Sequence, residues 1–478
     1  MSKNADDEHW IKERLEQLRC HFTWALLIKD TDMPDLENRI LEEIEFLDTK
    51  YNVGINNLLA YVKHLQGHNE AALESLKKAE ELIQQDHADQ SDLRSLVTWG
   101  NYAWVYYHMG RLAEAQIYLD KVENTCKRGV NPSHYRMECP EMDCEEGWAL
   151  LKCGGQNYER AKACFEKALE VDPENPEFST GYAITVYRLD DFAIETQRKG
   201  YSLQPLRQAI KLNPEDVHIK VLLALKLQDA GQEAEGEKYI EEALASTSSQ
   251  TYVFRHVGRF YRRKGSLDKA LQFFKKALQA TPASVFLHHQ IGLCYRAQVF
   301  QIKTAISKQP RRQDRENIDR IITLAISHLE FAVEQKPAFA IAYVHLASMY
   351  IEAGDYRKAE DAYQKALSIK PLEEVHEQEI HHHYGRFQEF QRKSEIDAIT
   401  QYLKAIKIEK ASFPRNKSIE SLEKLASKKL QRDPSDVESL SLLGFIHKLK
   451  GEMNEALEYY ERALRLTGDF ENSERCGP

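Results

Sequence analysis

The sequence predicts an all-α superhelix of stacked helix pairs, and three observations support this fold class. Small and aromatic residues recur at fixed offsets in several parts of the chain. No stretch of useful length shows the alternation of apolar and polar residues that is typical of β-strands. The composition, with 29% charged residues and only 14 prolines among 478 residues, is that of a helix-rich protein.

The repeat is clearest in the second half of the chain. Two stretches share all their offsets, and a third near the C-terminus lacks only the final proline: Gly258, Tyr261, Gly265, Ala270, Phe274, Ala277 and Pro282; Ala347, Tyr350, Gly354, Ala359, Tyr363, Ala366 and Pro371; Gly444, His447, Gly451, Ala456, Tyr460 and Ala463. This is the tetratricopeptide pattern, a 34-residue pair of antiparallel helices. Small residues let the helices approach, aromatic residues fill the space between them, and glycine caps the first helix.

Weaker copies account for most of the remaining sequence. In chain order their markers are Gly67, Ala72 and Ala79; Trp99, Ala103, Tyr106, Gly110 and Ala115; Ala161, Phe165, Ala168 and Pro173; Ala209 and Pro214; Ala224, Gly231 and Ala243; Gly292, Tyr295, Ala332 and Pro337; Ala398, Tyr402 and Ala405. Segments near 190–204 and 298–324 look like insertions. About ten units are therefore expected, and stacked repeats of this kind enclose a concave groove.

The groove is predicted to be positively charged, although the whole chain has a formal net charge of −10. In this repeat the first helix lines the groove through positions 2, 5, 9, 12 and 13. With Gly258 as position 8, these positions in QTYVFRHVGRFYRRKG (250–265) are Tyr252, Arg255, Arg259, Arg262 and Arg263. The same count in other units gives Phe286, His289 and Arg296, with Gln290 adjacent; Ile184 and Arg188; and Trp148 with Lys152.

Arginine and aromatic side chains together suit an anionic polymer, because guanidinium groups bind phosphates and aromatic rings stack on bases. A groove inside a superhelix favours a single strand over a duplex, and RNA is commonly recognised as a single strand. An acidic exterior would discourage indiscriminate phosphate binding. The competing interpretations are a solvated face with ion pairs for the cations and core packing for Trp148. At the level of function, the rivals are a clamp for an acidic peptide and a protein scaffold.

Catalysis is not expected, since the sequence contains none of the common nucleophile, phosphate-loop or metalloprotease motifs. No cofactor or metal site is expected either. The cysteines form no C-x-x-C pair, and consecutive histidines on a helix (His381, His382, His383) point in different directions. The charged start and the lack of long apolar runs suggest neither a signal peptide nor a membrane span, so a cytoplasmic location is expected.

Several strings go beyond the generic repeat. LEQLRCHFTW (15–24), PDLENRILEEIEFLDTKYNVGINNLLAYVKHL (34–65), SLVTWGNYAWVYYHMGRLAEAQ (95–116) and CEEGWALLKCGG (144–155) closely resemble the interferon-induced proteins with tetratricopeptide repeats, and most of all the first member of that family or a near paralogue. The resemblance covers nearly the whole chain. It implies a cytoplasmic antiviral effector that binds the 5′ end of foreign single-stranded RNA and blocks its translation without making or breaking a bond.

The resemblance also implies a division of labour along the chain. Residues 1–245 would hold the 5′ end, 246–371 would form a tunnel for the RNA body, and 372–478 would mediate oligomerisation. The 5′ end, a cap lacking 2′-O-methylation or a triphosphate, would be held by Trp148, Ile184, Leu47, Arg188, Lys152, Arg39, Glu43, Thr49, Tyr158 and His218. The RNA body would be held by Arg255, Arg259, Arg262, His289, Gln290, Lys336 and Phe339. Association would involve Leu457, Tyr460 and Leu464.

Three positions depart from the pattern of the cap-selective family member, and at one of them Arg259 replaces a lysine and keeps the positive charge. Glu43 replaces a glutamine near the bridging phosphates, where a carboxylate opposes phosphate unless a cation compensates, and His218 replaces a tyrosine. Glu43 leaves open which 5′ end is preferred. The expected partners are 5′-capped or 5′-triphosphate RNA, other members of the family, a second copy of the chain and a translation initiation factor, with neither DNA nor a membrane among them.

Overall fold

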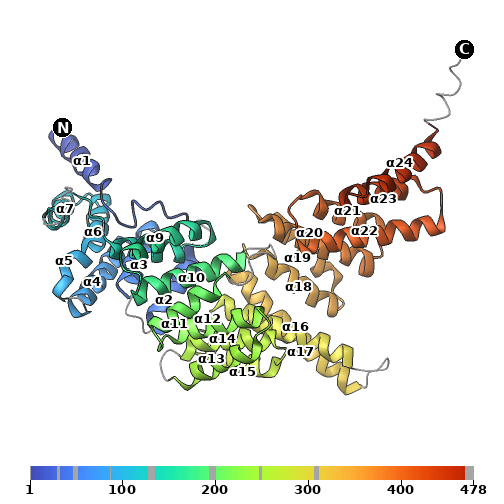
Figure 1. Cartoon of the computed structure of the whole chain (residues 1–478), viewed down its shortest axis with the longest axis horizontal. Helices are drawn as coiled ribbons and strands as arrows, with labels where there is room; N and C mark the ends of the chain where they lie inside the picture. Colours follow the sequence, from blue (N-terminus) through green and yellow to red (C-terminus); the bar gives the residue numbers. More distant parts are fainter. Residues whose placement is uncertain are drawn as a thin grey trace, which may run out of the picture. The chain divides into compact units, whose positions relative to one another are not determined.

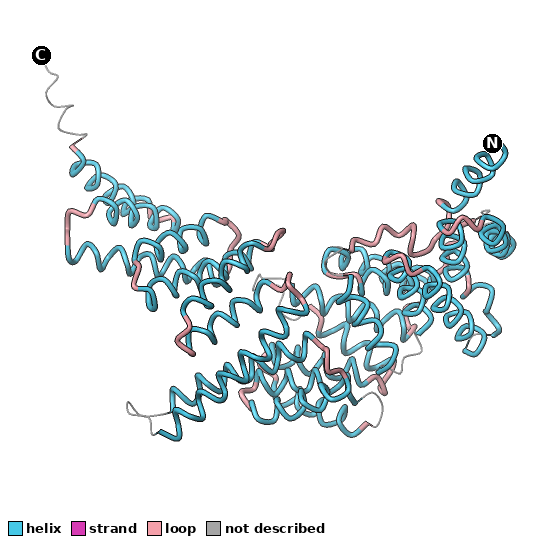
Figure 2. Tube along the Cα trace, turned by 180° about the vertical axis from the view of Figure 1, so that it is seen from behind, coloured by secondary structure: helices cyan, strands magenta, loops and turns pink. Residues whose placement is uncertain are grey.

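The computed structural model describes residues 2–28, 33–46, 52–86, 88–127, 135–192, 201–246, 250–305 and 312–468. None of the residues in these ranges lies in a strand, so the prediction of an all-α fold is confirmed (Figure 1). Most of the helix connections that lie wholly within these ranges are short loops (Figure 2). The chain forms two compact units, Met1–Leu287 and His288–Pro478.

Most helices of the first unit pack against a neighbour in sequence. The helices of this unit are α1 (Ser2–Leu15), α2 (Met33–Phe46), α3 (Asn52–Leu65), α4 (Asn69–Asp86), α5 (Ser91–Arg94), α6 (Leu96–His108), α7 (Leu112–Cys126), α8 (Pro140–Lys152), α9 (Tyr158–Val171), α10 (Pro176–Phe192), α11 (Leu203–Leu212), α12 (Val217–Asp229), α13 (Glu233–Ala245), α14 (Gln250–Arg263) and α15 (Leu267–Ala280), with short 3₁₀ turns η2 (Ala88–Gln90) and η3 (Gly155–Asn157). Within this unit α3 packs on α4, α6 on α7, α8 on α9, α12 on α13 and α14 on α15.

The second unit continues the same arrangement. Its helices are α16 (Val285–Ala305), α17 (Arg312–Gln335), α18 (Ala340–Glu352), α19 (Tyr356–Ser368), α20 (Glu374–Phe387), the π-helical turn η4 (Gln388–Arg392), α21 (Glu395–Lys407), α22 (Phe413–Arg432), α23 (Val437–Lys450) and α24 (Met453–Thr467). The predicted insertion near 298–324 extends α16 and α17 to 21 and 24 residues. None of the helices in the described ranges combines the length and apolar character that a membrane crossing requires.

The repeat offsets have a direct structural cause. Gly258 in α14 lies against the ring of Phe274 in α15, so closely that a Cβ at Gly258 would stand 2.6 Å from the ring. At the turn between these helices Gly265 has a φ of +82°, a left-handed conformation that L side chains rarely adopt. The same close approach joins Gly444 to Tyr460 at 2.8 Å. Glycine is therefore needed both for packing and for the turn.

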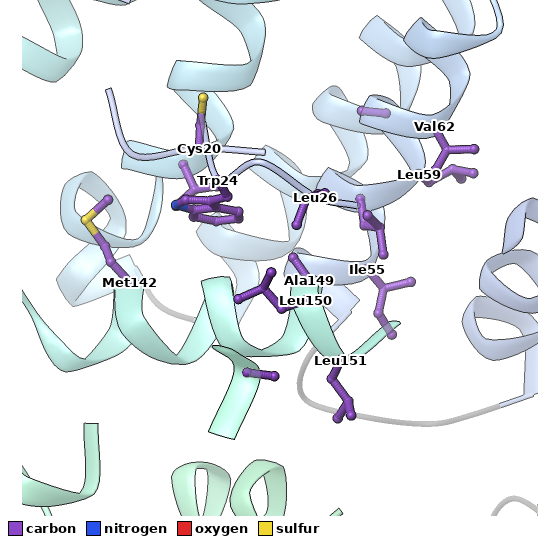
Figure 3. Packing of buried hydrophobic residues seen from close by; sticks show 14 of the residues in the cluster. Cys20, Trp24, Leu26, Ile55, Leu59, Val62, Met142, Ala149, Leu150 and Leu151 are labelled. Carbon is purple, nitrogen blue, oxygen red and sulfur yellow. The ribbon is translucent and has the colours of Figure 1, made fainter. Parts of the chain in front are cut away.

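The core of the first unit lies between helix layers and beneath the non-helical stretch that follows α1. Figure 3 shows Trp24 and Leu26 of that stretch lying over α8, near Ala149 and Leu150. Trp24 is 4% exposed and Leu150 is fully buried. Burying a large apolar side chain stabilises a fold by about 1.5–3 kcal/mol, so this segment fixes the position of α8. The orientation of α8 matters because its C-terminal half carries Trp148 and Lys152.

Candidate nucleic-acid interface

The first unit contains a cavity of about 340 Å³, with walls from α2, α3, α8, α10, α12 and α14. All predicted 5′-end residues that the structure describes line it: Arg39, Glu43, Trp148, Lys152, Tyr158, Ile184, Arg188 and His218. Arg255 and Arg259, predicted for the RNA body, line the same cavity. Leu47 and Thr49 lie outside the described residues. Helices far apart in sequence thus bring the predicted side chains to one place.

Trp148 is half-buried and meets the ring of Phe165 edge-on, at 5.4 Å between ring centroids and an interplanar angle of 80°. Lys152 follows one turn later on α8, and its Nζ lies 5.6 Å from the centre of the indole ring. Ile184 of α10 is 6% exposed and lines the same space. Trp148 therefore has both predicted roles, because its ring packs on Phe165 and the residue also forms part of the cavity wall.

Three carboxylates from α2 pair with the predicted phosphate-binding cations. Glu43 forms an ion pair with Lys152, and a carboxylate oxygen of Glu42 lies 2.7 Å from the guanidinium of Arg255. Asp35 lies 3.2 Å from Arg39. The sequence suggested that a cation would have to compensate for Glu43, and Lys152 is that cation.

The cavity is consequently close to charge balance rather than simply basic. Among the described residues, the basic lining side chains are Arg39, Arg94, Lys152, Arg188, Arg255 and Arg259, and the acidic ones are Asp35, Glu42, Glu43, Glu141, Glu145, Glu177 and Asp216. A ligand phosphate that reaches Lys152 or Arg255 competes there with a carboxylate. Binding therefore exchanges one ion pair for another, and the net gain depends on how many phosphates the ligand brings.

Two half-buried acidic residues, Glu145 and Glu177, line the cavity with Trp148, and neither was predicted from the sequence. Glu145 accepts a hydrogen bond of 2.7 Å from Asn57, and burial raises its pKa to about 7. Burial also raises the pKa of Glu177. A signal for Glu177 was present, because the repeat count that takes Ala183 as position 8 puts Glu177 at groove position 2. Such acceptors suit the N–H donors of a base edge.

Two histidines of the same cavity are held neutral. Burial lowers the pKa of His218 to about 3, helped by the nearby charges of Lys152 and Arg188. Burial also holds the pKa of His256 well below its usual range. Neither His218 Nε2 nor His256 Nδ1 has a hydrogen-bond partner among the described residues. At neutral pH these ring nitrogens can hydrogen-bond to a ligand without adding positive charge.

The arginine-rich helix α14 divides its cations between two faces. Arg259 donates a hydrogen bond of 3.3 Å to the hydroxyl of Tyr187, at the cavity wall. The repeat count placed Arg263 at groove position 13, but its guanidinium forms an ion pair with Asp229 at 2.9 Å. For Arg263, the structure therefore agrees with the alternative interpretation of the cations as ion-paired residues. Lys264 pairs with Glu237 at 2.8 Å. Arg262 does not line the cavity described above.

The other residues predicted for the RNA body lie in the second unit. His289 Nε2 is 3.0 Å from His345 Nδ1, and the His289 ring is 4.7 Å from that of Phe339. Gln290 is 8% exposed, next to His289 on α16. Lys336 directly follows α17, at the turn that leads to Phe339. These side chains gather at the N-terminal part of α16 and at the α17–α18 turn.

The predicted association residues of α24 have different environments. Leu457 is 62% exposed and Leu464 is 43% exposed. Tyr460 is half-buried, because its ring packs on Gly444 of α23. The structure therefore gives Tyr460 a role in packing within the repeat, while the two leucines remain available at the surface.

Comparison with known proteins agrees with this architecture. Profiles of the tetratricopeptide repeat match residues 96–124, 155–175, 221–285, 340–371 and 439–474. The chain is 71% identical to the antiviral innate immune response effector IFIT1 of Macaca fascicularis and 70% identical to that of Homo sapiens, over the full length of both partners. It is 46% identical to human interferon-induced protein with tetratricopeptide repeats 2, over 97% of each chain.

Solved structures give the same result. A monomeric IFIT1 mutant (L457E/L464E) with Gppp-AAAA matches at a TM-score of 0.92 and 69% identity, covering 96% of this chain and all of the other. A human IFIT1 dimer with PPP-AAAA matches at a TM-score of 0.87 and 66% identity, covering 96% and 99%. The repeat, the full-length identity and the structural match together place the chain in the family of interferon-induced proteins with tetratricopeptide repeats.

Proposed function

We propose that this protein is an antiviral RNA-binding protein that sequesters foreign single-stranded RNA by its 5′ end and blocks its translation. One observation carries the proposal: a single cavity in the first unit brings an indole, a buried aliphatic side chain and several cations together. A capped or triphosphorylated 5′ end presents the matching groups, a base for stacking and a row of phosphates. Relatives at 66–69% identity have been solved with Gppp-AAAA and PPP-AAAA, which supports the assignment.

In this proposal Trp148 stacks on the cap base, with Ile184 in the same pocket. A stacked base is worth about 1–3 kcal/mol when the aromatic ring is removed. The carboxyl groups of Glu145 and Glu177 line the same cavity as the indole and accept N–H groups of the base. Tyr158, 8% exposed at the start of α9, contacts the first nucleotides.

The phosphates are received by Lys152, Arg188, Arg39 and Arg255. A phosphate that takes over Lys152, Arg39 or Arg255 releases the carboxylate of α2 that pairs with that cation. Ligands with one phosphate gain little from this exchange, whereas a triphosphate or a cap bridge engages several cations together. The cavity would thus select for the number of phosphates as well as for the base.

The RNA body continues along Arg259, Arg262, His289, Gln290, Lys336 and Phe339. The action requires binding alone, and we propose that it takes place in the cytoplasm, where the bound 5′ end is withheld from translation initiation factors. Leu457 and Leu464 provide the surface for association with a second copy or with another family member. An IFIT1 mutant that carries L457E and L464E is monomeric, which supports that role.

The test is a binding series with one RNA body and four 5′ ends: triphosphate, cap without 2′-O-methylation, cap with it, and monophosphate. We expect at least one end to bind with strong salt dependence, and Arg255→Glu with Arg259→Glu to weaken it severely. Unchanged affinity in this double variant would remove these arginines from the interface. Binding of none of the four ends, together with binding of an acidic peptide, would favour the peptide-clamp alternative.

A further inference from the structure

The second unit contains another pair of arginines on inward-facing positions of its repeats. Arg296 of α16 occupies position 12 when Gly292 is taken as position 8. Arg386 of α20 occupies position 9 when Gly385, which packs on Tyr402, is taken as position 8. Ser348 of α18 occupies position 9 of the repeat between them. The three side chains therefore come from the groove faces of three successive first helices.

These arginines differ from those of the 5′-end cavity in their partners. Arg296 is half-buried, and its Nε donates a hydrogen bond of 3.2 Å to Ser348 Oγ. Neither Arg296 nor Arg386 forms an ion pair with any residue that the structure describes. Burial lowers the pKa of Arg296, which reflects the cost of a partly desolvated charge.

Two further groups lie within electrostatic reach of both guanidinium groups. Burial raises the pKa of Tyr363, and the positive charges of Arg296 and Arg386 both oppose that rise. Burial is the main cause of the low pKa of His383, which is about 3, and the same two charges contribute to it. Glu379 is one of the carboxyl groups that act on Arg296, and burial raises the pKa of Glu379 itself. The two arginines thus act on a common region, in which burial disfavours the charged form of Glu379.

Aromatic rings stand beside both arginines. The guanidinium carbon of Arg296 lies 5.1 Å from the centre of the Phe300 ring, and that of Arg386 lies 6.0 Å from Phe390. Phe300 is 39% exposed and Phe390 is 49% exposed. A cation for the phosphate and an exposed ring for the base are the two elements from which sequence-tolerant single-strand sites are built.

We propose that Arg296, Ser348 and Arg386 form a second phosphate site for single-stranded RNA, with Phe300 and Phe390 as stacking surfaces. The hydroxyl of Ser348 accepts from Arg296, so its own proton remains available for a phosphate oxygen. The position on α16 favours RNA over a free anion, because Arg296 lies seven residues after His289. Seven residues make two turns of a helix, about 10 Å along the same face. The proposal rests on the proposed function and extends its RNA path.

The test is a length series of 5′-triphosphate RNAs, from four nucleotides to about twenty, bound to the wild type and to Arg296→Gln/Arg386→Gln. We expect four-nucleotide binding to be unchanged and binding of the longer RNAs to fall by roughly tenfold or more, because charge-assisted hydrogen bonds to the RNA backbone are removed. The slope of log affinity against log salt should become shallower by about 0.7 for each phosphate that the variant no longer neutralises.

The matched control is Arg312→Gln/Arg432→Gln, which removes two exposed charges from the same unit. It should leave both affinity and slope at wild-type values. Arg386→Gln alone tests the site without touching the half-buried Arg296, since Arg386 is exposed. The phosphate site is refuted if the variants bind the long RNAs with wild-type affinity and slope. Failure of the wild type to bind even the short RNA would instead count against the proposed function.

Discussion

The ion pair between Glu43 and Lys152 gives the sharpest prediction, through Glu43→Gln. The carboxylate competes with a ligand phosphate for Lys152 and also repels it. Two unit charges 4 Å apart interact by about 4 kcal/mol at an effective dielectric constant of about 20. The side chains are 23% and 11% exposed, and halving the interaction for solvent screening leaves about 2 kcal/mol, or roughly thirtyfold in affinity. We expect Glu43→Gln to bind triphosphate RNA more tightly by that order.

The gain should depend on the 5′ end. A triphosphate carries an extra terminal charge compared with a cap bridge, so it should gain more than capped RNA, and a monophosphate should gain least. Fluorescence anisotropy with one RNA body and these three ends measures the ratios directly. The matched control is Glu45→Gln, an exposed residue of the same helix that does not line the cavity. Equal ratios for wild type and Glu43→Gln would refute the reasoning.

Four further predictions address the pocket, the surface and the fold. Trp148→Ala should weaken capped RNA roughly five- to hundredfold and triphosphate RNA less, measured by anisotropy. Leu457→Glu should abolish concentration dependence in sedimentation without changing the melting temperature, since the side chain is 62% exposed. Gly181→Ala would put a Cβ 2.2 Å from the buried ring of Phe165 and should lower the free energy of unfolding by about 1–3 kcal/mol. Gly54→Ala is the control, because the atom nearest to its Cβ would be 3.6 Å away, and it should leave the free energy of unfolding unchanged. The pKa of Glu145 is about 7 in the folded protein and 4.5 in the unfolded chain, so the folded state binds the proton more tightly. The free energy of unfolding should therefore fall as the pH rises from about 4.5 to 7. In urea titrations, Glu145→Gln should flatten that decline.

The repeat pattern predicted the fold because its offsets are packing constraints. Gly258 must be small since Phe274 occupies the space of its side chain, and Gly444 stands in the same relation to Tyr460. The position count within a repeat carried Arg255 and Arg259 to the cavity for a related reason. Once the helix pairs are in register, the inward face of each first helix is determined.

Features that the sequence did not predict also have physical causes. Arg263 follows the groove count, yet it pairs with Asp229, because a long side chain at the edge of a face can reach a neighbouring helix. The carboxylates of α2 could not be placed by the count, since α2 precedes the first recognisable repeat and has no register within it. The insertion near 298–324 was predicted, but the sequence analysis did not predict that it would lengthen α16 and α17.

These carboxylates change the meaning of the acidic composition. A net charge of −10 suggested an acidic exterior around a basic groove, but Glu42 and Glu43 bring negative charge into the cavity itself. Cations held by carboxylates are fixed in position before the ligand arrives, so little reorganisation is needed on binding. The same pairs make a lone phosphate a poor competitor. The Arg296 site has no such carboxylate pairs among the residues that the structure describes, so a backbone phosphate could bind there without displacing one. The carboxylates of α2 would then determine which 5′ end is preferred. Arginines that have no carboxylate partner among the described residues, such as Arg296, would supply affinity for the RNA body.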